Sequence, residues 1–368
     1  MRNNFHTSLA AISIACLAAP VLAQSAPMTY RDWSVTCNNI KTCMAYSASS
    51  TSEGVGRVRP RGMSDDVPEG WMTIERAAGP NSVARILISR PNLESTQIPA
   101  DAELHLLDSN GRSVSTGVFA ATMGDRSAIE IHPSVQGQFL SAARAASHVV
   151  FVVGGVKRPV FFVSLSGLVA SGRNIDARQG RTNTQGALID IGQISNSRVP
   201  VAPPLPIVIA QAFVARAASA PPASLISRRM TECDDFQTLS ARNRTIESYR
   251  LNRTQILWSV ACNMGAYNTW NRYYIQSPRD VIAPAKFIGS GIEDRREANS
   301  LVNTGVDPAK GLITAFSKAR GVGDCGSDET YAWNGQAFVL ATRIEMAPCG
   351  GIIADFWPSV VASRIVTR

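Results

Sequence analysis

The fold is decided first by the stretch Trp33-Ser-Val-Thr-Cys37-Asn-Asn-Ile-Lys-Thr-Cys43-Met-Ala-Tyr46. Trp33, Val35 and Cys37 alternate with polar residues, which is the period of a half-buried strand. A short polar turn follows, and Cys43 opens a second apolar run that ends at Tyr46. The pattern predicts a β-hairpin in which the two cysteines face one another.

Cysteine spacing extends this prediction along the whole chain. The chain has seven cysteines, and six of them form three pairs that are close in sequence. Short loops close most readily, so each pair is expected to form a disulfide worth roughly 2–4 kcal/mol, with none crossing between the two halves of the chain. The expected disulfides are Cys37–Cys43, Cys233–Cys262 and Cys325–Cys349.

The cysteines could instead bind zinc or perform dithiol exchange. No C-x-x-C pair occurs, and no histidine follows His148, so the spacing of a zinc site is absent. The missing C-x-x-C also removes the usual oxidoreductase motif. We therefore expect structural disulfides, and neither a metal nor a cofactor.

Residues 1–23 have the composition of a secretory signal peptide. Arg2 supplies a basic start, Leu9 to Leu22 form a short apolar stretch, and Ala23 ends a small-residue cleavage site. The apolar stretch is shorter than the ~20 residues that a membrane span needs. We expect cleavage before Gln24, a periplasmic location, and no transmembrane anchor in the mature chain.

The positive net charge suggests a nucleic-acid partner, but the type and spacing of the basic residues argue against one. The formal net charge is +8, but only five of the 36 basic residues are lysines. The densest run, Arg57-Val-Arg59-Pro-Arg61, lacks the flanking aromatics that stack on bases. We expect no nucleic-acid partner, and only a long-range attraction to anionic envelope polymers.

Proline and alanine divide the chain near its middle. Residues 196–227 are rich in both, as expected of a semi-rigid spacer, and Ile207 to Ala218 could form a short helix within it. The predicted fold class is α+β, mainly β, with two disulfide-braced domains. These are a β-rich N-terminal domain over residues 24–195, which ends in a helix, and a C-terminal α+β domain over residues 228–368.

Strand signals fill both domains. In the first, Asn110-Gly111 predicts a hairpin turn, and Val149 to Val153 pairs with Val160 to Val163. In the second, the strand from Gln255 to Val260 leads through Cys262 to another at Tyr273-Tyr274-Ile275. Asn334-Gly335 predicts a further hairpin turn.

A helix is expected from Leu165 to Ile175, followed by a polar cluster. Such charges usually form a solvated face, with arginines that favour a helix C-terminus. A binding site is the alternative. The cluster consists of Asp176, Arg178, Gln179 and Arg181.

Several motifs are spread along the mature chain: Tyr30-Arg-Asp-Trp33-x-Val-x-Cys37 with Cys43, Ser164-Leu-Ser-Gly167, Asp176-x-x-Gln179-Gly180-Arg181, Cys262-x-x-Gly265-Ala-Tyr267-Asn268, Gly321-x-Gly323-Asp324-Cys325-Gly326, Trp333-Asn-Gly335 with Phe338, and Trp357-Pro358. Together they resemble a family of exported bacterial proteins, the domain of unknown function 1176. The resemblance covers nearly the whole mature chain and implies a two-domain periplasmic protein without a known activity. The first domain is also similar to the invasion-associated locus B family of exported β-rich proteins. Gly172 and Asn174 depart from the pattern, which prefers larger apolar residues there.

Familiar catalytic motifs fail in context. Gly321 to Gly326 spell G-x-G-x-x-G, but a strand-like run follows where a dinucleotide site needs a helix, so a tight turn beside Cys325 is expected. Three carboxylates lie close in sequence and are expected in one loop: Asp324, Asp328 and Glu329. Together with Asp176 they leave open a carboxylate-dependent hydrolase of an envelope polymer.

The favoured hypothesis is a non-catalytic protein that binds an envelope protein or glycan, with inhibitor-like or host-interaction roles as variants. Loops on a braced scaffold make adaptable contact surfaces. Aromatic residues and arginine are enriched at interaction hot spots. The candidate contact residues are Tyr267, Trp270, Arg272 and Tyr273. The alternative is that at least half of these aromatics are core residues.

Overall fold

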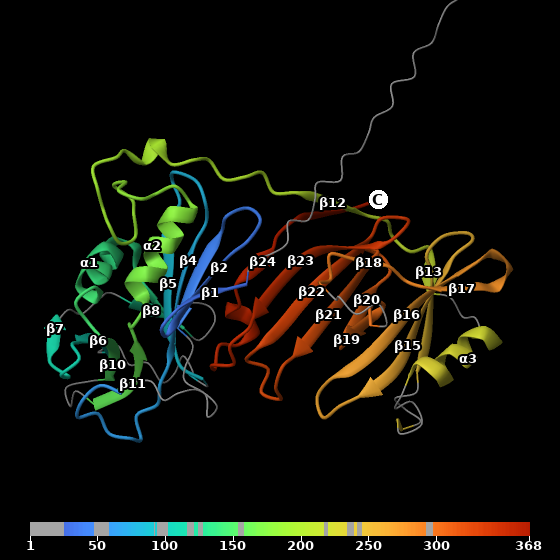
Figure 1. The fold of residues 1–368 in the computed structure, drawn as a ribbon, viewed down its shortest axis with the longest axis horizontal. Helices are drawn as coiled ribbons and strands as arrows, with labels where there is room; N and C mark the ends of the chain where they lie inside the picture. The colour runs from blue at the N-terminus through green and yellow to red at the C-terminus, as the bar shows by residue number, and fades with distance from the viewer. Residues whose placement is uncertain are drawn as a thin grey trace, which may run out of the picture.

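The computed structural model describes residues 26–47, 59–91, 93, 102–115, 121–123, 128–153, 158–216, 220–233, 239–240, 245–291 and 297–368. The expected signal peptide, residues 1–23, lies outside them. Over these ranges the chain is mainly β-structure with three α-helices, arranged as several sheets (Figure 1). None of the helices in this part of the chain has the length and apolar character needed to cross a membrane.

The first sheet is antiparallel and begins with the predicted hairpin. Cys37 and Cys43 are directly opposed in its register and form a disulfide, with 4.0 Å between their Cα atoms. The strand order is β1-β2-β3-β4-β5-β9-β8. The strands are β1 (Met28–Tyr30), β2 (Trp33–Cys37), β3 (Cys43–Ser47), β4 (Trp71–Arg76), β5 (Ala84–Ser89), β8 (Ala121–Met123) and β9 (Ile129–Ile131).

A second sheet packs on the first through a shared apolar core. Met72 and Ile86 of the first sheet meet Leu104 and Phe161 of the second in one buried cluster. Both strand pairs predicted here are confirmed, including the turn at Asn110-Gly111. The sheet has the order β11-β10-β6-β7, with β6 (Ala102–Leu107), β7 (Ser113–Ser115), β10 (His148–Val153) and β11 (Arg158–Ser164).

Two helices complete this core. They are α1 (Pro133–Ala143) and α2 (Leu168–Arg178), and α2 confirms the predicted helix with a start three residues later. Phe139 and Leu140 of α1 and Leu168 and Ile175 of α2 all join the buried cluster. The short 3-10 helix η2 (Asn196–Arg198) follows α2.

The expected helix over Ile207 to Ala218 is wrong. Residues 199–206 run extended along the top of the molecule in Figure 1 and lead into β12 (Ile207–Ala210). This strand pairs in parallel with β25 (Arg364–Thr367), beside the C-terminus. The preceding prolines favour extended backbone, and the branched side chains of β12 suit a strand. The partner that fixes this choice is more than 150 positions further along the chain.

Two six-stranded sheets form the C-terminal half. The first contains β13 (Ala215–Arg216), β14 (Ile246–Arg250), β15 (Ile256–Met264), β16 (Thr269–Ser277), β17 (Val281–Pro284) and β19 (Ser300–Val302). The second contains β18 (Phe287–Ile288), β20 (Thr304–Asp307), β21 (Leu312–Lys318), β22 (Gly326–Trp333), β23 (Phe338–Met346) and β24 (Ser359–Val361). The short 3-10 helices η5 (Pro278–Asp280) and η6 (Ala354–Phe356) precede β17 and β24. The predicted strands around Cys262 and the Asn334-Gly335 hairpin are confirmed.

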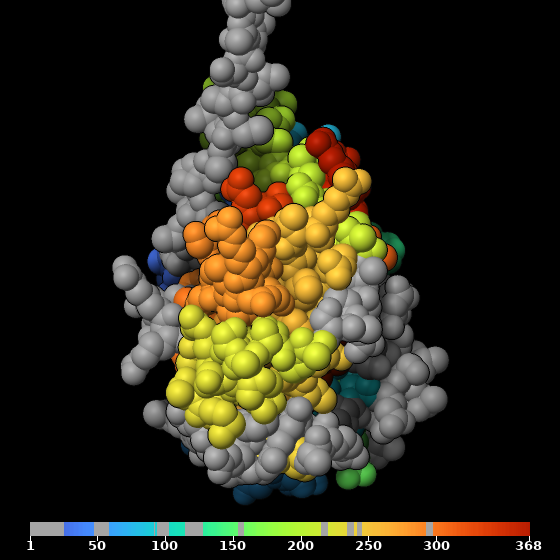
Figure 2. All heavy atoms as spheres, turned by 90° about the vertical axis from the view of Figure 1, so that its right-hand side faces the viewer, coloured from blue at the N-terminus to red at the C-terminus, as the bar shows by residue number. Residues whose placement is uncertain are grey.

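Helix α3 (Ala223–Glu232) lies against the first of these sheets. Leu225 of α3 packs with Trp258 and Val260 of β15, and Figure 2 shows the helix on the surface at that end of the molecule. Cys233, directly after α3, bonds to Cys262 of β15. Cys325 and Cys349 join the loops at one end of the β22–β23 pair. All three expected disulfides are therefore present.

The two halves meet over a buried cluster. The rings of Trp71 and Phe356 lie 4.8 Å apart, and Met44, Tyr46 and Leu87 pack with Met346 and Trp357 across the same contact. A polar contact also joins the two halves: the Asn38 side chain donates to the Ser359 hydroxyl at 3.1 Å. A boundary between independent domains at residues 196–227 stays a prediction.

Candidate functional site

The four candidate contact residues lie on or near the β15–β16 hairpin, in different environments. Tyr267 sits in the turn with 41% of its surface exposed, whereas Tyr273 is fully buried. The Tyr273 hydroxyl donates to Thr304 at 2.7 Å, and burial raises its pKa to about 12. Trp270 is half-buried, and Arg272 pairs with Glu297 at 2.6 Å. Assigning Tyr273 to a contact surface is thus corrected: it is a core residue.

An amide network holds the hairpin turn in place. The Asn303 side chain accepts from the Thr269 N–H at 2.8 Å and donates to Asn268 Oδ1 and to the Phe316 carbonyl, both at 2.8 Å. Asn268 in turn donates to the Lys318 carbonyl at 2.8 Å. The turn is therefore tied to β20 and β21, far away in sequence. No local sequence pattern marks Asn303 as a residue that holds this turn.

Tyr267 faces the loop that leads from β21 to β22. Its hydroxyl donates to the Ala319 carbonyl at 3.2 Å, and its ring lies against Gly321. Two apolar side chains near it in sequence or next to Gly321 are open to solvent: Met264, three positions before Tyr267, is 46% exposed, and Val322 is 76% exposed. We call Met264, Ala266, Tyr267, Gly321 and Val322 the hairpin-tip surface.

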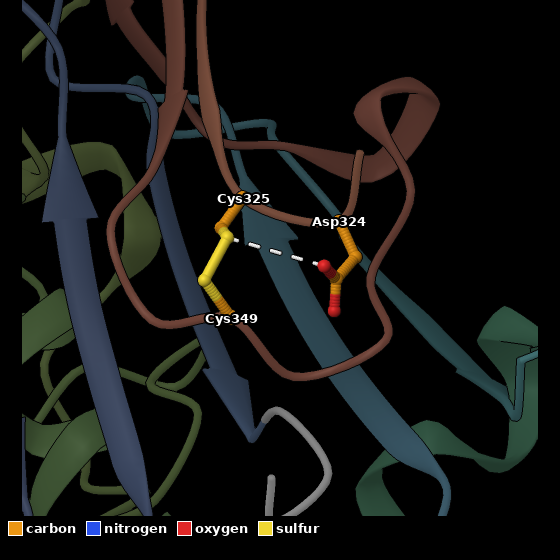
Figure 3. Close-up of side chains that lie close together, drawn as sticks. All are labelled: Asp324, Cys325 and Cys349. Atoms are coloured by element: carbon orange, nitrogen blue, oxygen red, sulfur yellow. Dashed lines mark hydrogen bonds between the residues drawn. A yellow bond between two sulfur atoms is a disulfide. The ribbon is translucent and has the colours of Figure 1, made fainter. Parts of the chain in front are cut away.

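The loop beside this surface is braced by an ion pair and a disulfide. Asp324 is 3% exposed, accepts from Arg320 Nε at 2.6 Å and from the Gly351 N–H at 2.7 Å, and lies next to the Cys325–Cys349 disulfide (Figure 3). Burial raises the pKa of Asp324, but its bonds to Arg320 and Gly351 outweigh this and leave it lowered. Its proximity to the two sulfurs makes no metal site, because both are bonded to each other.

The G-x-G-x-x-G stretch forms the expected turn. The Gly323 N–H donates to the Arg320 carbonyl at 3.0 Å, and Gly323 has a φ of +69°. Glycine tolerates this left-handed conformation without a steric penalty. The last residue of the motif, Gly326, begins strand β22, so the motif does not lead into the helix of a dinucleotide site.

Asp328 and Glu329 lie on strand β22, which corrects the predicted acidic loop. Neighbours on a strand point to opposite faces. Glu329 accepts from Arg343 Nε at 2.7 Å and from the Tyr331 hydroxyl at 2.6 Å. Asp328 instead lines a cleft of about 410 Å³ between the two halves, together with Asp355 and others. Burial, and then the charge of Glu329, raise the pKa of Asp328.

The polar cluster at the C-terminal end of α2 is mostly buried. The exposed fractions of Asp176, Gln179 and Arg181 are 3%, 2% and 0%, so the solvated-face interpretation is wrong for them. The Leu188 N–H donates to Asp176 at 2.9 Å, and Gln179 donates to two carbonyls on the first sheet. These three residues fasten the segment after α2 to the first sheet.

Arg178 alone of this cluster reaches the surface, where its Nε donates to Asn174 at 3.1 Å. Asn174, one of the two departures from the family pattern, also donates to the Tyr30 hydroxyl at 3.0 Å. The other departure, Gly172, leaves room for Ile189, since a Cβ there would lie 2.4 Å from that side chain. Both departures are therefore accommodated by packing.

Known proteins agree with the resemblance drawn from the motifs. Residues 28–364 match the family described as "Protein of unknown function (DUF1176)". The chain is 26% identical over 364 residues to the uncharacterized protein YpfG of Escherichia coli strain K12, covering 94% of this chain and 95% of that one. Among solved structures, invasion associated protein B from Bartonella henselae matches at 17% identity with a TM-score of 0.28, over 42% of this chain and 99% of that chain.

Proposed function

This chain belongs to the DUF1176 family, and from that premise we propose that it is an exported protein that binds a protein partner in the periplasm. The contact is made by the hairpin-tip surface, and no substrate is turned over. The composition of residues 1–23 supports export, and three disulfides suit an oxidising compartment.

The observation that carries the proposal is the exposed ring of Tyr267 on a fixed backbone. Its turn is held by Asn268 and Asn303, and its hydroxyl is held by Ala319. Because this surface is already held in place, binding a partner costs it little conformational entropy, which favours affinity. Tyrosine is also enriched among residues that dominate binding energy.

The apolar neighbours favour a protein over a glycan as the partner. Met264 and Val322 are both well exposed, and they extend the apolar area around Tyr267. Exposed apolar patches that include an aromatic side chain mark protein contacts. Inhibition of an envelope enzyme and contact with a host protein are two roles that the same surface could serve.

Capture of partners from periplasmic extract tests the proposal. The mature chain from Gln24 is tagged, and capture by Tyr267→Ala is compared with capture by Val281→Ala, which truncates a side chain 58% exposed on β17. A hot-spot loss of about 2 kcal/mol should weaken binding of a retained protein at least tenfold for Tyr267→Ala only.

Urea unfolding of each variant shows whether the fold is kept. Equal capture by Tyr267→Ala and Val281→Ala would contradict the proposal. If the mature chain retained a polysaccharide and no protein, the partner would be a glycan and the protein-partner proposal would be wrong.

One observation favours a hydrolase as the second candidate. Asp328 has a raised pKa in a cleft that also contains Glu75 and Asp355, as suits a general acid near a second carboxylate. The other carboxylates considered from the sequence hold structural contacts. If Asp328→Asn abolished a hydrolysis of envelope polymer shown by the unmodified protein, the enzyme hypothesis would replace the binding hypothesis.

A further inference from the structure

A pocket of about 430 Å³ opens beside the β4–β5 loop, far along the chain from the hairpin-tip surface. The loop of residues 80–83, helix α1 and residues 186–196 supply its walls. Two large side chains on it are open to solvent, Val83 at 63% and Ile191 at 62% exposure. Its apolar lining consists of Pro80, Val83, Ala84, Pro133, Leu140, Ala187, Leu188 and Ile191.

A buried arginine also lines this pocket. Arg76 is 6% exposed and donates to the Gly186 carbonyl at 2.7 Å and to the Ser82 carbonyl at 3.1 Å. Its Nε is buried and has no hydrogen-bond partner in the described part of the chain. A guanidinium carries five N–H donors, so Arg76 keeps an unused donor at a site shielded from water.

The charges around Arg76 do not balance. Arg181 is fully buried behind the same loop and bonds to Ser82 Oγ at 2.5 Å, and its Nη1 has no hydrogen-bond partner among the residues that the structure describes. Asp176 is the carboxylate that faces both arginines, 3.9 Å from Arg76 Nη1, and it already accepts the Leu188 N–H. Burial, and then the charge of Arg181, lower the pKa of Arg76 to about 10. Two guanidinium groups therefore share one carboxylate, and an uncompensated buried cation is costly.

An unused acceptor lines the same pocket. Asn196 Oδ1 is buried without a hydrogen-bond partner among the described residues, and Asn196 also lines the pocket. The two groups meet at Gly186, whose carbonyl binds Arg76 and whose Cα faces the Asn196 amide, 2.6 Å from where a Cβ would lie. Any larger residue at position 186 would displace that amide.

We propose that this pocket binds the C-terminus of a peptide whose last residue is apolar. The terminal carboxylate pairs with Arg76, the last amide N–H donates to Asn196 Oδ1, and the apolar side chain packs between Val83, Leu140 and Ile191. Capture of a terminal carboxylate by buried donors is a known mode of peptide recognition. The volume is within the range of small-ligand sites. The pocket shares no residue with the hairpin-tip surface, so it goes beyond the function proposed above.

Calorimetric titration of the mature chain tests the chemistry with small probes. N-acetyl-L-leucine carries all three features, N-acetyl-L-leucinamide lacks the negative charge, and 4-methylpentanoate lacks the amide. We expect N-acetyl-L-leucine to bind at one site, and each of the other two to bind at least about tenfold more weakly.

Variants locate the binding without disturbing the core. Ile191→Asp places a negative charge at the exposed rim and should weaken N-acetyl-L-leucine at least about tenfold, whereas Val281→Asp, at an equally exposed position outside the pocket, should not. Asn196→Ala should abolish the preference over 4-methylpentanoate. The proposal is overturned if the acid and the amide bind equally, if folded protein binds neither at millimolar concentration, or if both aspartate variants behave alike.

Discussion

Asn303→Ala tests whether the hairpin-tip surface is held in place by one side chain. Asn303 bridges the Thr269 N–H and the Phe316 carbonyl, each at 2.8 Å, and binds Asn268 between them. Its own backbone is left-handed, with a φ of +45°. Alanine removes all of these side-chain contacts and disfavours that backbone conformation.

The expected loss of unfolding free energy is about 3 kcal/mol. Two partly buried backbone groups lose their partner, at about 1 kcal/mol each, and alanine in the left-handed region adds about 1 kcal/mol. Asn303→Gly loses the same hydrogen bonds without the steric term of alanine at positive φ, so its loss should be about 2 kcal/mol.

Urea unfolding of the mature protein and of each variant measures both losses. The Gly265 amide donates to the Asn268 carbonyl at 2.8 Å, so its hydrogen exchange reports on the stability of the turn. The matched control is Asn334→Ala, because Asn334 Oδ1 also accepts two backbone N–H groups, at 2.9 Å each, but in an exposed turn. Its loss should stay below about 1 kcal/mol, since water can replace the bonds. A loss for Asn303→Ala no larger than that of the control would refute the reasoning.

Three further predictions concern an ion pair, a ring contact and a disulfide elsewhere in the structure. The pKa of Asp324 is lowered in the folded state, so its charge stabilises the fold above the unfolded pKa of about 4. This stabilisation is lost as the pH falls through the folded-state pKa. The urea midpoints of the unmodified protein and of Asp324→Asn should therefore differ at neutral pH and converge in acid. A double-mutant cycle of Trp71→Ala and Phe356→Ala should give a coupling of about 1 kcal/mol across the two halves, and zero coupling would deny their ring contact. Replacing Cys37 and Cys43 together by serine should lower the unfolding free energy by about 2 kcal/mol, whereas an unchanged midpoint would show that this short loop constrains little.

The sequence by itself determined the features that depend on neighbouring residues. The alternation from Trp33 to Cys37 and the turns at Asn110-Gly111 and Asn334-Gly335 specify hairpins, because strand period and turn geometry act over a few residues. The disulfide pairs follow for a related reason, since cysteines separated by 6, 29 and 24 positions meet without a long loop to close.

The tertiary structure alone decided which polar groups are buried and what neutralises them. The motif from Asp176 to Arg181 looked solvated because its balancing partner, Arg76, comes from a strand about 100 residues earlier. Likewise, the Ile207–Ala210 segment became a strand only because β25 offers it a parallel edge. Burial and charge compensation are properties of groups brought together by the fold, and a local pattern carries no information about a partner that is distant in the chain.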